Sequence, residues 1–125
     1  MIAADTSAMV AYLSGGEAGQ DLDLIAAAMA NAELALPPIV LTELTSSGSS
    51  ERLLDNDLAK LPLLELTDGY WVRAGQTRRL LIRKGLKAKT ADALIAQSCI
   101  DHDVALITRD KAFRHFARHC GLKLA

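Results

Sequence analysis

Short apolar runs alternate with longer stretches of helical pattern along this 125-residue chain. A strand followed by a helix pairs in parallel with the next strand, because the helix carries the chain back along the sheet. The alternation therefore predicts a doubly wound α/β fold in a single domain, residues 1–125, with about four to five short strands in a three-layer arrangement. The expected strands are Met1–Ala4, Glu33–Leu36, Leu63–Leu66, Val104–Ile107 and, more weakly, Leu122–Leu124.

The stretches between these runs have apolar spacing and capping residues that are typical of helices. Pro38 is suited to a first helical turn, where its missing N–H costs nothing. A Ser/Gly run, Ser46–Ser50, should end the helix that begins there. The expected helices are Thr6–Leu13, Glu17–Asn31, Pro38 to about Ser46, Glu51–Ala59, Asp68–Lys84, Lys89 or Thr90 to about His102, and Asp110–His119.

The composition is that of an ordinary soluble protein, with 50% hydrophobic and 23% charged residues and a net charge of −1. Any nucleic-acid binding must therefore come from a local basic patch. No apolar run approaches the length of a membrane span, and an acid follows the first four residues at once, so we expect a cytoplasmic protein without a membrane segment. Cys99 and Cys120 lack metal-ligand spacing and are expected to be reduced thiols.

Two acidic residues come at or shortly after the ends of predicted strands. Asp5 comes after the first strand and Asp110 comes shortly after Val104–Ile107. The carboxyl ends of parallel strands share one edge of the sheet, where ligands bind in folds of this class. Each of the two carboxylates also fits as a helix cap, and for either one alone the two interpretations remain open.

Two further acids lie inside apolar helical sequence. Glu43 follows Ile-Val-Leu-Thr, and Asp92 precedes Ala-Leu-Ile-Ala. A charge in apolar surroundings is costly unless it is paired or bound to a cation, so a solvated helix face explains these two poorly. Four carboxylates drawn together would repel one another, and a divalent metal removes that repulsion. Oxygen-only ligands suit Mg²⁺ or Mn²⁺.

Four short motifs in order carry a resemblance to a known family. They are Asp-Thr-Ser from Asp5, Pro-Pro-Ile-Val-Leu-Thr-Glu-Leu from Pro37, Ala-Asp-Ala-Leu-Ile-Ala from Ala91, and Leu-Ile-Thr-Arg-Asp-Lys-Ala-Phe from Leu106. Each motif alone is weak, but the four span nearly the whole chain at the spacing of the family. The chain resembles PIN-domain ribonucleases, and most of all the VapC toxins of bacterial toxin–antitoxin pairs.

The resemblance implies a metal-dependent endoribonuclease, the toxin of a type II toxin–antitoxin system. By this resemblance the acids Asp5, Glu43, Asp92 and Asp110 bind Mg²⁺, and Thr6 and Thr108 support the site. Hydrolysis by metal-activated water would leave a 5′-phosphate and a 3′-hydroxyl. A small antitoxin would cover the acidic groove, and homodimers are common. Many relatives carry an extra acid or Asn two residues after the last acid. Ala112 stands there in this chain, so that extra carboxylate is absent.

One stretch of the chain is strongly basic, with no acid among its cations. As a phosphate-binding rim it would lead RNA to the acids, and as a solvated helix end it would have no such role. Arg109 and Arg114 flank Asp110 and could add to the rim or pair with acids when metal is absent. The residues of the basic stretch are Arg78, Arg79, Arg83, Lys84, Lys87 and Lys89.

Other functions fit the residues less well. A catalytically silent PIN-like domain would bind RNA or a partner without cleavage, but it would not need the four acids. A receiver-like phospho-acceptor domain needs an acid pair after the first strand, whereas Asp5 stands alone. A nucleotide-hydrolysing phosphate loop is excluded because its Gly-rich motif is absent. Tyr70 and Trp71 begin an apolar helix face, which favours packing over base stacking, with Trp71 near the face of Ala74 and Leu81.

Overall fold

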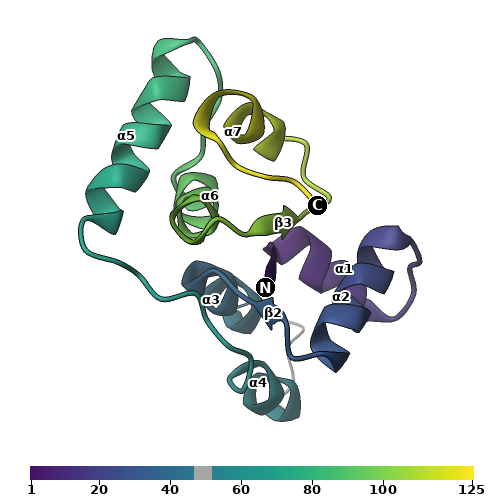
Figure 1. Cartoon of the computed structure of the whole chain (residues 1–125). Coiled ribbons are helices and arrows are strands. Elements are labelled where there is room, and N and C mark those ends of the chain that lie inside the picture. Colours follow the sequence, from purple (N-terminus) through teal and green to yellow (C-terminus); the bar gives the residue numbers. More distant parts are fainter. Residues whose placement is uncertain (47–51) are drawn as a thin grey trace.

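The structure, a computed structural model of the chain, describes residues 1–46 and 52–125. Three strands form a parallel sheet in the order β2-β1-β3: β1 (Ile2–Ala4), β2 (Leu34–Ala35) and β3 (Ala105–Ile107). The helices around it are α1 (Thr6–Ser14), α2 (Gln20–Ala30), α3 (Pro38–Ser46), α4 (Arg52–Leu58), α5 (Tyr70–Arg83), α6 (Thr90–His102) and α7 (Phe113–Cys120) (Figure 1). The prediction of a doubly wound parallel α/β fold is confirmed.

The edges of the sheet are shorter than the sequence predicts. Leu63–Leu66 does not form a strand, because only Leu63 pairs, through one parallel bridge to Leu36 beside β2. The next bond to this segment would come from the N–H of residue 38, and Pro38 has none, so the pairing stops there. On the other edge Leu124 makes a single parallel bridge with Leu106 of β3.

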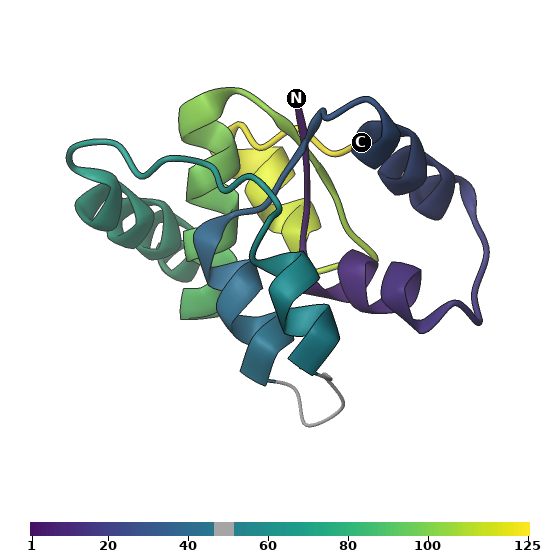
Figure 2. The same cartoon turned by 90° about the horizontal axis from the view of Figure 1, so that it is seen from below.

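Helices cover both faces of the sheet. α1 and α2 lie on one side, and α6, with α5 outside it, lies on the other, while α3 packs against both α1 and α6 (Figures 1 and 2). Between these layers lies an apolar core whose largest members are fully buried, among them Met9, Ile25, Leu106, Phe113 and Phe116. In the described part of the chain no helix is long and apolar enough to span a membrane.

Some helix boundaries differ from the predicted ones by up to three residues. α5 begins at Tyr70 instead of Asp68, since Gly69 adopts a left-handed backbone with φ of 80°. α7 begins at Phe113 instead of Asp110, because the Asp110 carboxylate accepts a 2.9 Å hydrogen bond from the backbone N–H of Ala112 and forms a turn there. α2 begins at Gln20, three residues after the predicted start. Residues 47–51, which include most of the expected Ser/Gly run and the predicted start of the fourth helix, lie outside the described residues.

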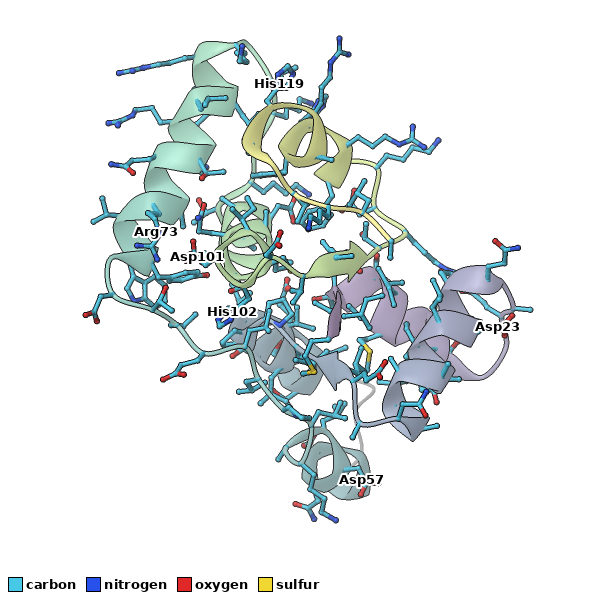
Figure 3. All side chains as sticks on the ribbon, in the orientation of Figure 1. Asp23, Asp57, Arg73, Asp101, His102 and His119 are labelled. Carbon is cyan, nitrogen blue, oxygen red and sulfur yellow. The ribbon has the colours of Figure 1, made fainter. Side chains whose placement is uncertain are left out.

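A polar network fixes α5 across α6. Arg73 binds Asp101 through two hydrogen bonds of 2.7 and 3.1 Å, and Figure 3 shows the two side chains facing each other. Gln97 donates a 2.8 Å bond to the same carboxylate and accepts one from Thr77. The phenol of Tyr70 donates a 2.6 Å bond to the carbonyl of Leu94. These contacts set the orientation of α5 beside the helix that carries Asp92.

Both cysteines are free thiols, as predicted. Cys99 is fully buried in α6, and burial raises the pKa of its thiol to about 12. A thiol in that state is inert as a nucleophile.

Candidate active site

The register of the central strands places two polar residues side by side. Ala4 pairs with Ile107, so β1 and β3 end at the same level. The next residues along the chain, Asp5 and Thr108, are therefore neighbours, and Asp5 N–H donates a 3.0 Å bond to the carbonyl of Ile107. The strand order switches sides at this pair, which is where ligand sites form in open α/β sheets.

Asp5 is both a helix cap and the centre of a hydrogen-bond network. Its side chain is only 3% exposed and accepts from the backbone of Ala8 (2.9 Å), from Ser7 Oγ (2.8 and 3.0 Å) and from Thr108 Oγ1 (2.6 Å). Burial nevertheless raises the pKa of Asp5, and the negative charge of Asp110 adds to that effect. Asp5 therefore caps α1, and the same carboxylate lies at the centre of the polar contacts that join the ends of β1 and β3.

Ser7 is a member of this network that the sequence analysis did not identify. Besides donating to Asp5, its hydroxyl accepts a 3.0 Å bond from the backbone N–H of Arg109. It thereby ties the first turn of α1 to the loop after β3. A hydroxyl two residues after an acid at a helix start was the available signal, because such side chains bond locally.

Glu43 reaches the same corner of the molecule from α3. The hydroxyl of Thr6 donates a 2.6 Å bond to Glu43 Oε1, and the bond is partly buried. α1 packs against α3, so two hydroxyls in its first turn hold two acids. Ser7 donates to Asp5, which precedes the helix, and Thr6 donates to Glu43 on α3. Thr6 and Thr108 thus each donate to one of the four acids.

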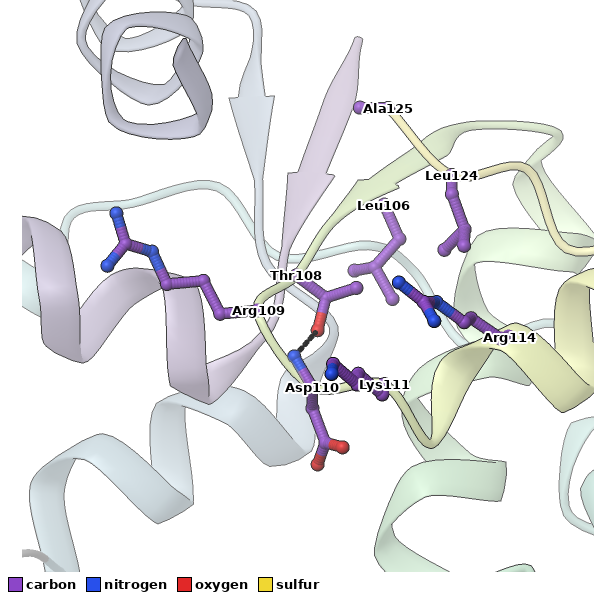
Figure 4. Close-up of a pocket in the computed structure, with 8 residues that line it drawn as sticks. All are labelled: Leu106, Thr108, Arg109, Asp110, Lys111, Arg114, Leu124 and Ala125. Atoms are coloured by element: carbon purple, nitrogen blue, oxygen red, sulfur yellow. Dashed lines mark hydrogen bonds between the residues drawn. The ribbon is translucent and has the colours of Figure 1, made fainter. Parts of the chain in front are cut away.

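Asp92 and Asp110 complete the acidic group. Asp92 lies in the first turn of α6 and is half-buried, and burial is the largest cause of its raised pKa. The charges of Asp110, Glu43 and Asp5 raise it further, while that of Lys89 lowers it. Asp110 is exposed, and Figure 4 shows its carboxylate pointing away from the other side chains drawn. The four acids come from the cap of α1, from α3, from α6 and from the loop after β3, and they lie close enough that the other three raise the pKa of Asp92.

The donor chemistry of this group fits a hard divalent cation. All four side chains are carboxylates, and they repel one another, which a cation would relieve. Within residues 1–46 and 52–125, no three His, Cys, Asp or Glu side chains already converge into a closed metal site. Asp110 is the exposed member, so its side chain is the one with room to move toward the others.

Arg109 is held away from this group by acidic partners. Its guanidinium donates to Asp21 (2.5 and 3.1 Å), to Glu17 (2.5 Å) and to the carbonyl of Ala18 (3.2 Å). It pairs with acids, but with those at the start of α2 instead of the four predicted ones. In Figure 4 it extends to the opposite side from Arg114. Its observed contacts fasten the α1–α2 connection to the loop after β3.

The residues of the basic stretch have different surroundings. Arg78 donates a 2.7 Å bond to the carbonyl of Ala88 and so braces the α5–α6 connection. The charge of Lys84 acts on His119 at the end of α7, which lies at the amino edge of the sheet, away from the acids. Lys87 and Lys89 are exposed on the connection into α6, and Lys89 acts on Asp92. Arg79 and Arg83 line a surface hollow with Lys84.

A separate hollow of about 260 Å³ opens on the outer side of β3 (Figure 4). Thr108, Asp110 and Arg114 line it, but none of the other three acids does. The acidic group therefore borders this hollow through Asp110 alone.

Comparison with known proteins agrees with this fold. The PIN domain model matches residues 2–119. A solved structure described as VapBC2 from Rickettsia felis bound to a DNA fragment from their promoter is similar, with a TM-score of 0.74 and 24% sequence identity over 100% of this chain and 98% of that one. At that identity the likeness shows the fold alone. No curated protein matches. The match over almost the whole length shows that this chain belongs to the PIN domain family.

Proposed function

We propose that this PIN domain is a metal-dependent endoribonuclease and the toxin component of a type II toxin–antitoxin system, acting in the cytoplasm. One observation carries the proposal: Asp5, Glu43, Asp92 and Asp110 gather at the carboxyl edge of the sheet, where the charges of the other three acids raise the pKa of Asp92. Structural ion-pair networks neutralise such acids with cationic side chains. Among the described residues, Lys89 is the cation whose charge lowers the pKa of Asp92.

The four carboxylates would hold Mg²⁺ or Mn²⁺, which would neutralise charge on the scissile phosphate and make an attacking water more acidic. Thr108 and Ser7 keep Asp5 in one orientation, and Thr6 does the same for Glu43. Asp92 has a raised pKa and remains accessible, so it is the acid best suited to accept the water proton. In-line attack leaves a 5′-phosphate and a 3′-hydroxyl.

The proposed partners follow from the toxin assignment. The structural neighbour is described as VapBC2 bound to a DNA fragment from their promoter, which supports a cognate antitoxin for this chain. The surfaces of α1, α2 and α4 are the candidate contact, and a homodimer is part of the proposal. For the RNA path we favour Lys87 and Lys89 over Arg83 and Lys84, because of the position of Lys89 beside Asp92.

A cleavage assay tests the proposal. Purified protein and an end-labelled single-stranded RNA are incubated with Mg²⁺, with Mn²⁺, or with excess EDTA. We expect cleavage with either metal, none in EDTA, and products that carry a 5′-phosphate. Undiminished cleavage in EDTA would contradict the metal mechanism. RNA binding without cleavage under any metal would identify the silent PIN-like domain instead.

A further inference from the structure

The guanidinium of Arg109 is enclosed by the connection between α1 and α2. It makes four hydrogen bonds there: two to the carboxylate of Asp21, at 2.5 and 3.1 Å, one to Glu17 at 2.5 Å, and one to the carbonyl of Ala18 at 3.2 Å. The two bonds to Asp21 form a fork, which fixes the relative orientation of both planar groups. The contact therefore holds the side chain of Arg109 in one orientation.

Gly19 lets the connection close around this guanidinium. Its backbone has a φ of 155°, which residues with a side chain rarely adopt. A Cβ at this position would lie 2.5 Å from Oδ1 of Asp21 and 3.3 Å from Nη2 of Arg109. The Asp21 carboxylate would have to move, and its fork with Arg109 would be lost. At Gly16, in the same connection, a Cβ would meet no atom within 4 Å, so the close approach occurs where the chain passes Arg109.

The main chain on either side of Arg109 is held as well. The N–H of Arg109 donates a 3.0 Å bond to Ser7 Oγ, and the N–H of Asp110 donates a 3.0 Å bond to Oγ1 of Thr108 (Figure 4). Beyond Asp110 the chain is anchored by the buried ring of Phe113, the first residue of α7. The position of the Asp110 backbone therefore follows from the contacts of its neighbours.

Asp110 is the acid for which such support matters most. Asp5, Glu43 and Asp92 lie within a helix or at its cap, whereas Asp110 lies in a loop and is exposed. Its negative charge acts on both Asp5 and Asp92, so repulsion pushes the loop outward when no cation is present. A loop fastened to the α1–α2 connection resists that displacement. Its backbone is then already ordered when a cation binds, which favours binding.

We propose that Arg109 is a positioning residue for the metal site: clamped by Glu17 and Asp21, it fixes the main chain at Asp110 so that this carboxylate can join the other acids around a divalent cation. This inference rests on the proposed metal-dependent function. In this role Arg109 contacts neither the cation nor RNA. Its guanidinium points away from the Asp110 carboxylate in Figure 4, and the two acids that clamp it hold its charge away from the acidic group.

Charge alone predicts the opposite effect of removing this side chain. A positive charge near four carboxylates weakens the binding of a second cation, so its removal should strengthen metal binding. A residue that only stabilises the fold should leave the metal affinity of the folded protein unchanged. A positioning residue should lower that affinity when it is removed. The metal affinity of an Arg109 variant therefore rises, stays or falls according to which of the three roles the side chain has.

Binding of Mn²⁺ in the absence of RNA measures this effect. Each protein is checked for its fold by circular dichroism and titrated with Mn²⁺ at pH 7, while the free ion is followed by electron paramagnetic resonance. Arg109→Gln should bind about 10- to 100-fold more weakly than the wild type, the range for loss of an outer contact that orients a metal ligand. Arg109→Lys, which keeps the charge but lacks the fork, should lose affinity too. Unchanged or tighter binding by Arg109→Gln would overturn the proposal.

Lys111→Gln is the matched control for charge. Lys111 directly follows Asp110, as Arg109 directly precedes it, and its side chain is exposed. The control removes the same charge from the same loop but leaves the clamp intact, so Mn²⁺ should bind as tightly as in the wild type or more tightly. A loss in Lys111→Gln as large as that in Arg109→Gln would show that the clamp is not the cause.

Gly19→Ala tests the clamp without changing any charge. The added Cβ displaces Asp21 from Arg109, so Mn²⁺ affinity should fall, whereas Gly16→Ala should keep the wild-type affinity. In Arg109→Gln the fork is already absent, so combining it with Gly19→Ala should cause no further loss. Losses that add in the double variant would contradict the proposal, because the two residues would then act independently.

The same titrations separate this inference from the function on which it rests. If the wild type binds no Mn²⁺, the proposed metal-dependent function fails and the role of Arg109 fails with it. If the wild type binds Mn²⁺ and Arg109→Gln binds it equally well, only the role of Arg109 fails. Weaker binding in Arg109→Gln, Arg109→Lys and Gly19→Ala, with wild-type binding in Gly16→Ala, is the result that the proposal predicts.

Discussion

The hydroxyl of Thr108 donates a 2.6 Å hydrogen bond to Asp5, which lies 103 residues earlier in the chain. The same hydroxyl accepts a 3.0 Å bond from the backbone N–H of Asp110. One side chain therefore connects an acid after β1 with an acid after β3, and it does so because the two strands end in register.

Thr108→Val removes this hydroxyl while keeping the volume of the side chain. Because the hydroxyl bonds to an ionised group, unfolding in urea should show a loss of roughly 1.5–3 kcal/mol. RNA cleavage should fall with it, since Asp5 loses its partner across the strands. Thr108→Ser is the matched control and should cost about 1 kcal/mol or less, because it keeps the hydroxyl. A loss in Thr108→Val no larger than that in Thr108→Ser would contradict the predicted contribution of the hydrogen bond.

Asp92→Asn should make the metal-free protein as stable as the wild type or more stable at pH 7. Burial and three neighbouring acids raise the pKa of Asp92, so its charge is unfavourable in the folded state. The Asp5→Asn protein should be less stable than the Asp92→Asn protein. Asn can still cap α1, but it lacks the second oxygen that accepts the bond from Thr108. Thermal unfolding in EDTA measures both. A clear loss of stability in Asp92→Asn would contradict the like-charge account.

Asp101 should contribute stability that disappears in acid. Hydrogen bonds from Arg73 hold the pKa of Asp101 below its ordinary value of 3.8, although partial burial opposes this. The contribution is therefore complete above about pH 4 and disappears as the pH falls through the folded-state pKa. Asp101→Asn should be less stable than the wild type at pH 7, and the difference should narrow below about pH 4.

Urea unfolding at pH 7, 5 and 3.5 measures this change. Asp103→Asn is the control, because its partner Lys123 and Asp103 itself are both exposed, and exposed pairs contribute little. A difference between Asp101→Asn and the wild type that is constant with pH would mean that the ion pair does not account for the effect.

The two halves of the basic stretch should differ in RNA binding. Lys87 and Lys89 lead into the helix of Asp92, whereas Lys84 lies beside the end of α7. The double variant Lys87→Ala/Lys89→Ala should bind more weakly and show a shallower salt dependence, by about 0.7 in the log–log slope for each phosphate group that is no longer neutralised. Arg83→Ala/Lys84→Ala should keep the wild-type slope. The reverse pattern would place the RNA path beside Arg83 and Lys84, toward the end of α7.

The sequence predicts the positions of the four acids because each depends on local pattern. Asp5 and Asp110 follow apolar strands, and Glu43 and Asp92 interrupt apolar helical sequence. Parallel pairing then brings the strand ends to one edge of the sheet. The order of the elements and the fold class follow from the same periodicity.

Features that depend on one distant partner could not be predicted in this way. Arg109 flanks Asp110 in the sequence, but its guanidinium binds Glu17 and Asp21 because the turn after β3 aims it toward the start of α2. Trp71 faces solvent because Tyr70 has its partner on α6. Neither orientation is encoded in the spacing of the residues that carry it.

The most direct test of the account compares cleavage of one single-stranded RNA with Mg²⁺ by three proteins: the wild type, Asp92→Asn and Asp23→Asn. Asp23 is an exposed acid on α2, outside the acidic group, and serves as the control (Figure 3). The account predicts that Asp92→Asn keeps its fold but loses at least about a hundredfold in cleavage rate, while Asp23→Asn cleaves like the wild type. Wild-type cleavage by Asp92→Asn would contradict the claim that the four acids form the catalytic site.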